Sequence, residues 1–167
     1  ARHGFTHILI VNGHGSNQSI CDLAARDCVI KTGMICAATT VNAAVDPSLV
    51  RDVLDTERRG GPGSVGHACE YETAMMLHLH PERVDMSLAR RDIGQLKLNY
   101  FNWDNPEPSA YAWQDWWSRF SSEGIAGDAA AATPEFGRRM FDVTVERFVE
   151  LAREFRTIPI RPRRDHH

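Results

Sequence analysis

The stretch HILIVNGHGSNQ, residues 7–18, decides the fold prediction because a β-branched apolar run stops abruptly at a glycine-containing turn. Residues 8–11 have the composition of a strand buried on both faces of a sheet. Gly13 and Gly15 permit the sharp exit that leaves His14 at the carboxyl end of this strand. In open α/β sheets that edge is where ligands bind. His14 is therefore a candidate metal or substrate ligand, and the alternative is a solvated histidine in a turn.

Residues 16–41 extend this strand into a parallel unit. Ser16 or Asn17 can cap a helix that continues to about Lys31, with apolar residues at helical spacing, and Gly33 ends it. A short apolar strand over residues 34–41 follows. Strand, helix and strand in this order imply parallel pairing, which predicts an α/β fold.

A second chemistry-bearing segment, GHACEYET at residues 66–73, opens another helix. It places one imidazole, His67, and two carboxylates, Glu70 and Glu72, close to the positive end of the helix dipole. Four glycines and a proline precede it within residues 58–66, which excludes regular structure. We interpret these residues as a mobile active-site loop, and the alternative is a plain connector.

Two further helices are predicted along the chain, together with the continuation of the helix opened at residues 66–73. Asp46–Pro47 begins a surface helix that runs to Glu57, and an apolar helix over residues 73–79 ends before Pro81. Thr133–Pro134–Glu135 begins a long amphipathic helix whose inward stripe consists of Phe141, Val145, Phe148, Ala152 and Phe155.

Residues 93–123 contain all four tryptophans, within 15 positions. Aromatic side chains form walls that select flat rings or amides, and they are also enriched at oligomer interfaces. We interpret Trp116 and Trp117 as interface residues. For Trp103 and Trp113 both interpretations stay open, and we take these two as candidate substrate-binding residues.

Composition narrows the classes of protein. At 167 residues with 43% hydrophobic residues the chain suits one domain, and a net charge of −3 argues against a nucleic-acid partner. No apolar run approaches the ~20 residues of a membrane span, and no signal peptide is visible. Four cysteines without CxxC spacing are typical of core thiols in a reducing compartment. We expect a cytoplasmic protein.

Together these motifs resemble the creatininase (creatinine amidohydrolase) family. The family has a strand ending in an Asn-Gly-His-Gly-type turn, matched by residues 12–17, and a Gly-His-Ala-Gly-x-x-Glu-Thr-type helix start, matched by residues 66–73. A Gly-Asp segment before the last helix is matched by Gly127–Asp128. The resemblance covers most of residues 4–155. It implies a three-layer α/β/α sandwich with a mostly parallel sheet, over one domain at residues 1–160 with a tail at 161–167.

The resemblance also implies roles for individual residues. His67 matches the catalytic histidine, and His14 matches a metal-binding histidine. Glu72 matches the glutamate of the Glu-Thr pair, as a metal ligand or as the carboxylate that orients His67. Gly15 and Ser16 would line the substrate site. Creatininase itself has a metal-binding glutamate where this chain has Ser16, which argues against creatinine as the substrate.

Family members are longer and carry upstream a Glu-x-His pair and an Asp that supply much of a two-metal centre, and residues 1–6 contain no such set. The implied function is hydrolysis of an amide C–N bond, with a cyclic amide favoured, by a hydroxide bound between two divalent metal ions: zinc, manganese or iron. We expect the chain to be the C-terminal piece of a split or processed enzyme, whose separate N-terminal chain supplies the missing ligands, in a homo- or hetero-oligomer that is hexamer-like in the family. The alternative is a metal-poor binding or structural subunit. No nucleic-acid or membrane partner is expected.

Overall fold

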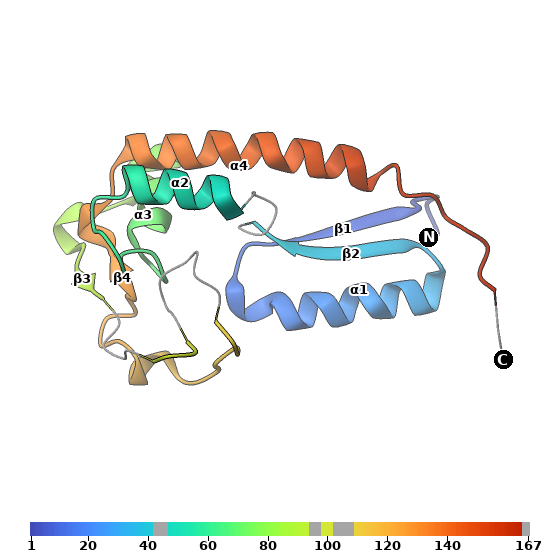
Figure 1. Ribbon diagram of the computed structural model, residues 1–167, viewed down its shortest axis with the longest axis horizontal. Helices are drawn as coiled ribbons and strands as arrows, with labels where there is room; N and C mark the ends of the chain where they lie inside the picture. The colour runs from blue at the N-terminus through green and yellow to red at the C-terminus, as the bar shows by residue number, and fades with distance from the viewer. Residues whose placement is uncertain (42–46, 94–97, 102–108, 165–167) are drawn as a thin grey trace. The chain divides into compact units, whose positions relative to one another are not determined.

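The computed structural model describes residues 1–41, 47–93, 98–101 and 109–164, and gives no side-chain description for residues 47–51 (Figure 1). The described chain divides into two compact units. Unit 1 comprises Ala1–Val45 and Thr144–His167, and unit 2 comprises Asp46–Val143. Our assignment of residues 1–160 to a single domain stays a prediction.

Unit 1 is the strand, helix and strand unit that the sequence predicts. Strand β1 (His7–Asn12) pairs in parallel with β2 (Ile35–Thr40), in a register that places His7 opposite Ile35. Helix α1 (Gln18–Thr32) connects the strands and packs on one face of the pair, and it ends where Gly33 adopts a left-handed φ of 69°. The second half of α4 (Pro134–Phe155) runs along the other side (Figure 1). Parallel pairing and the α/β class are confirmed.

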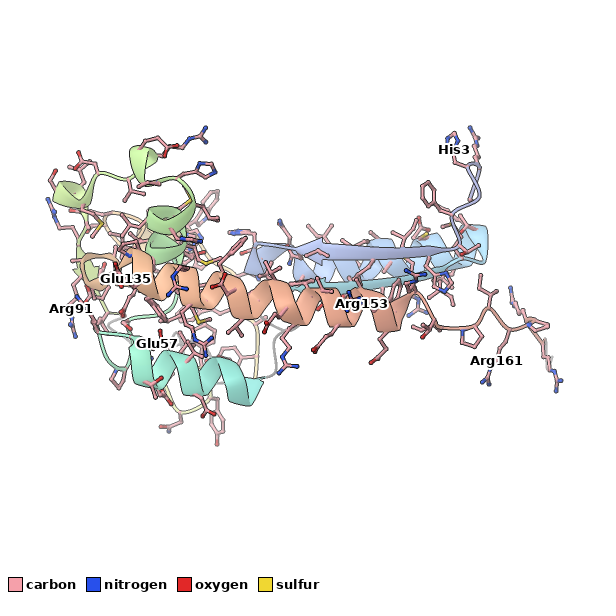
Figure 2. All side chains as sticks on the ribbon, turned by 90° about the horizontal axis from the view of Figure 1, so that it is seen from above. His3, Glu57, Arg91, Glu135, Arg153 and Arg161 are labelled. Atoms are coloured by element: carbon pink, nitrogen blue, oxygen red, sulfur yellow. The ribbon has the colours of Figure 1, made fainter. Side chains whose placement is uncertain are left out.

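Contacts at the far end of α4 explain this placement. The ring of His7 meets that of Phe155 edge-on, with centroids 5.8 Å apart, and His7 Nε2 donates a hydrogen bond of 2.7 Å to the carbonyl of Ile158. The chain then leaves the helix as an exposed tail, and the labelled Arg161 projects from it (Figure 2). Among the described residues, no helix is both long and apolar enough to cross a lipid bilayer.

Burial in unit 1 differs from the prediction. We expected β1 to be buried on both faces, but Ile8 and Val11 are 37% and 49% exposed. The apolar residues at helical spacing on α1 are not covered either, because Ile20 and Leu23 are 67% and 68% exposed, and Ala25 is the buried residue of the helix. The physical reason is that two described strands provide too little sheet to cover these side chains.

Unit 2 contains short elements joined by loops. Helix α2 (Pro47–Glu57) and helix α3 (Glu70–Leu79) precede β3 (Arg91–Asp92), which pairs antiparallel with β4 (Gly127–Asp128). The described core of the unit consists of Val53, Leu54, Val65, Cys69, Ala74, Ala126, Ala129, Ala132, Phe136, Met140 and Val143. Our prediction of α2 as a surface helix is therefore wrong for Val53 and Leu54, which are 4% and 2% exposed because they pack into this core.

Helix α4 begins as the sequence predicts, because Thr133 Oγ1 accepts a hydrogen bond of 3.2 Å from the backbone N–H of Phe136. Three residues into the helix, Gly137 lies directly against α3. A Cβ atom built on Gly137 would overlap the carbonyl oxygen of Ala74. This close backbone contact explains why the buried residue of α3 at this level is the small Ala74, whereas Met76 and Leu79 of the same helix are 38% and 42% exposed.

Candidate functional site

In the turn after β1, hydrogen bonds from neighbouring residues fix the backbone of His14. Asn12 is 5% exposed, and its side-chain oxygen accepts a hydrogen bond of 3.0 Å from the backbone N–H of His14. The amide of Asn12 donates to the side chain of Gln18, and the carbonyl of His14 accepts from the N–H of Asn17. The backbone of the turn is therefore fixed on both sides of His14, whose side chain is exposed.

Gly15 and Ser16 lie in the same turn and are exposed, in a 3-10 turn spanning Gly15–Asn17 that leads into α1. The structure therefore brings three predicted site residues, His14, Gly15 and Ser16, together in unit 1. The other described site residues, His67, Glu72 and Trp113, lie in unit 2.

His67 is held by its backbone immediately before α3. It forms an isolated antiparallel bridge with Ala126, in which each residue donates its N–H to the carbonyl of the other at 2.8 Å. The next residue, Ala68, has a φ of +47°, a left-handed conformation that is unfavourable for a residue with a Cβ atom. The bridge and this turn direct the chain from an extended segment into the helix within three residues.

The imidazole of His67 stacks on the indole of Trp117. The ring centroids are 4.1 Å apart and the ring planes differ by 25°. Both side chains are half-buried. A stacked contact uses the faces of the rings, whereas the two imidazole nitrogens carry their N–H and lone pair in the ring plane, so the stack restricts the ring without using the atoms that transfer protons.

Further aromatic rings continue from Trp117. Phe120 meets Trp117 edge-on at 5.8 Å, and Trp113 meets Phe120 edge-on at 4.8 Å. Phe101 then contacts Trp113 at 5.6 Å and Tyr111 at 5.5 Å. Trp113, a predicted substrate-binding residue, is thus part of a row of rings that leads to His67. Trp103 lies outside the described residues.

The two tryptophans that we interpreted as interface residues differ from each other. Trp116 is 73% exposed, whereas Trp117 has an intrachain role against His67 that the sequence did not indicate. The interface interpretation of Trp116 stays a prediction.

Glu70 is a charged residue in the core. It is 1% exposed, and its two carboxylate oxygens accept hydrogen bonds from the backbone N–H groups of Arg59 and Gly60, at 2.5 and 2.9 Å. Its own N–H donates to the carbonyl of Ser64, which also accepts from the N–H of Asp128. The glycine-containing loop that we interpreted as mobile is thereby tied to the first turn of α3 and to β4.

Glu72 lies two residues further along α3 and is exposed. Its Oε2 accepts a long hydrogen bond of 3.9 Å from the thiol of Cys69. Burial raises the pKa of the Cys69 thiol to about 11, because a thiolate would lose its hydration inside the unit. Cys69 is therefore a protonated core thiol at neutral pH, as predicted, and not a nucleophile.

The chain offers donor types that divalent metals accept, an imidazole in His14 and a carboxylate in Glu72. Among the described residues, however, no group of three or more His, Cys, Asp or Glu side chains gathers closely enough to hold a metal ion. These residues therefore do not form a complete metal site by themselves.

Three contributors to the site were missed by sequence reasoning: Trp117, Ala126 and the loop-anchoring role of Glu70. For Trp117 the clustering of tryptophans was a signal, but it did not indicate a partner. For Glu70 the signal was an acid in the first turn of a helix after a glycine-rich loop, a position from which a carboxylate can accept backbone N–H groups.

Comparison with known proteins places these observations in a family. The creatininase family profile, described as creatinine amidohydrolase, matches residues 1–152. No curated protein matches the chain. Among solved structures, a candidate creatinine amidohydrolase from Bacteroides fragilis NCTC 9343 is 26% identical, with a TM-score of 0.68 over 96% of this chain.

Two creatininase structures resemble the chain in fold. One, described as the Mn form, is 23% identical over 92% of this chain with a TM-score of 0.64. The other, a mutant creatininase described as Zn-Zn type, is 22% identical over 92% of this chain with a TM-score of 0.63. The chain spans 57–58% of the length of these three relatives. The predicted creatininase-like α/β fold is confirmed, and the chain belongs to the creatininase family, a family of metal-dependent amidohydrolases.

Proposed function

We propose that this chain contributes the catalytic histidine of an amidohydrolase that cleaves a C–N bond in a small amide, with a cyclic amide favoured. The observation that carries the proposal is the placement of His67, whose backbone is paired with Ala126 and whose ring is stacked on Trp117 at the start of α3. An imidazole held in one orientation is suited to deliver a proton to the departing nitrogen of an amide.

The proposal includes a separate N-terminal chain. The chain spans less than two thirds of its relatives' length, and neither unit gathers three metal-binding side chains among its described residues. We propose that His14 and Glu72 bind two divalent ions, zinc, manganese or iron, only together with Glu, His and Asp ligands from that N-terminal chain.

The roles of this chain's residues follow from their chemistry. His67 holds and transfers a proton at a ring nitrogen. The turn of Gly15 and Ser16 leaves room beside His14 for a substrate, because no side chain lies where a Cβ of Gly15 would be. Trp113 would bind the flat face of an amide.

The test combines mass and activity measurements on the protein as purified from its source. Native mass spectrometry is expected to show two types of polypeptide with bound metal. Hydrolysis of a panel of cyclic amides and formamides, followed by chromatography of the ring-opened product or of the released formate and amine, is expected to be lost in His67→Gln. The control is His80→Gln, an exposed histidine paired with Glu82.

Three outcomes would contradict parts of the proposal. Full hydrolysis by His67→Gln would refute the catalytic role of His67. A longer single polypeptide with metal would refute the separate N-terminal chain. A single chain type without metal would favour the second candidate, a non-catalytic binding or structural subunit, which the lack of a three-ligand group among the described residues supports.

A further inference from the structure

The segment from Trp117 to Ala126 contacts His67 twice, once through each of its ends. At one end, the indole of Trp117 stacks on the imidazole at 4.1 Å. At the other, Ala126 forms both hydrogen bonds of the bridge with the backbone of His67. One segment therefore fixes both the backbone and the ring plane of the same residue.

This segment is itself tied down at its centre. Ser121 is 8% exposed, and its hydroxyl donates a hydrogen bond of 3.0 Å to the carboxylate of Asp92 in β3. The same hydroxyl oxygen accepts from the N–H groups of Glu123 and Ile125, at 3.3 and 3.0 Å. These bonds fix the turn between Ser121 and Ile125 and tie it to β3.

The backbone at Trp117 is fixed as well. The carbonyl of Trp117 accepts from the N–H groups of Phe120 and Ser121. Asp115 accepts from the N–H of Trp116 and from the guanidinium of Arg119, both at 2.8 Å, which brackets Trp117 from either side. Phe120 and Trp113 then limit rotation of the indole through edge-on contacts.

We propose that Trp117 is a positioning residue for His67, whose ring plane it holds through the stack. The kinetic consequence of this inference rests on the proposed function, but the orientation itself does not. Trp117 acts through His67 and touches none of the reacting atoms. An imidazole that rotated about its χ2 bond would direct its nitrogens away from a bound amide for part of the time, and small misplacements of a catalytic group are costly to the rate.

The orientation is tested by NMR of the full chain with labelled histidine. The chain has eight histidines, and the signals of His67 are assigned by their disappearance in His67→Gln. A ring stacked on an indole has its ring protons displaced upfield. We expect this displacement in the wild type, its loss in Trp117→Leu and its partial retention in Trp117→Phe, whose smaller ring still stacks.

The matched control is Trp116→Leu, because Trp116 is adjacent in sequence but 73% exposed. It is expected to leave the His67 signals in place. Unchanged His67 signals in Trp117→Leu would overturn the proposal. If Trp117→Leu does not fold, Trp117→Phe provides the test. An upfield displacement of the His67 ring protons that is as large in Trp117→Phe as in the wild type would also overturn the proposal.

Kinetics provides the second arm, on the assembled enzyme. Trp117→Leu is expected to lower kcat by about tenfold to a hundredfold with little change in KM, and Trp117→Phe to recover most of the loss. If Trp117→Leu loses the upfield displacement of the His67 signals but keeps the kcat of the wild type, Trp117 does not position His67 for catalysis. If the wild type hydrolyses no amide, the proposed function fails, and the NMR arm alone supports or overturns the orientation of His67.

Discussion

At the scale of single residues, the two glutamates of α3 have different roles although they are two positions apart. Glu70 is buried and accepts two backbone N–H groups, whereas Glu72 is exposed and contacts the thiol of Cys69. A buried carboxylate is tolerated only when its oxygens are hydrogen-bonded, and the loop before α3 provides the donors for Glu70. Glu70 therefore stabilises the loop, whereas Glu72 keeps an exposed carboxylate.

Replacement of Glu70 by Gln tests this difference. The new NH₂ group would face the N–H of Arg59 or Gly60, which leaves a buried donor without an acceptor. We expect the free energy of unfolding to fall by about 2 kcal/mol in urea melts. Glu72→Gln is the matched control on the same helix, and we expect it to change the free energy of unfolding by less than about 0.5 kcal/mol. Equal effects of the two changes would contradict the assignment.

Cys69 gives a pH-dependent prediction. Its pKa is raised from 9.0 to about 11 by burial, so the folded state favours the protonated thiol. The resulting stabilisation is complete below pH 9 and is lost as the pH rises through about 11. We expect the stability advantage of the wild type over Cys69→Ala to shrink between these values, as measured by urea melts in a pH series. An advantage that stays constant over that range would argue against a buried thiol.

At the scale of elements, the crossing of α3 and α4 depends on Gly137. A Cβ atom at this position would overlap the carbonyl of Ala74 and come 3.0 Å from the backbone nitrogen of Met75. The obstacle is backbone, which cannot rotate away as a flexible side chain can.

Gly137→Ala is therefore expected to be destabilising, although alanine favours helices more than glycine does. Forcing the helices apart should cost about 2 kcal/mol in the free energy of unfolding. Gly13→Ala is the control, because no atom lies within 4 Å of the added Cβ and the backbone there is not left-handed. An unaltered unfolding midpoint in Gly137→Ala would show that the two helices do not meet at this glycine.

Element positions were predictable from the sequence where local signals exist. Gly33 and Thr133 mark a helix end and a helix start that the structure confirms, and the apolar run after His7 gives β1. Burial was not predictable in the same way. Ile20 and Leu23 have apolar spacing on α1, yet they are exposed, because periodicity identifies a face and not what covers it.

In the candidate site, too, features with a local sequence signal were predictable and contacts between distant segments were not. His14 and His67 were identifiable because each follows a turn with its own glycine and polar signals. The Trp117 and Ala126 contacts with His67 join residues about fifty positions or more apart, and nothing local in either segment specifies the partner.

At the scale of the whole molecule, the donor set for metal is incomplete in the described residues. We therefore expect residues 1–167 alone, dialysed against manganese or zinc and then against buffer, to retain less than one equivalent of metal. Addition of the proposed N-terminal chain should raise retention, as measured by elemental analysis, and Glu72→Gln should lower it again. Retention of two equivalents by residues 1–167 alone would contradict a site shared between chains.

The division of the chain has a consequence for its synthesis. Unit 1 is assembled from the first 45 residues and from Thr144 onward, whereas unit 2 is continuous in sequence. β1 and β2 are translated before residues 144–155 of α4, which belong to the same unit, and all residues of unit 2 are translated in between. The two strands can therefore complete their unit only after the whole of unit 2 has been synthesised.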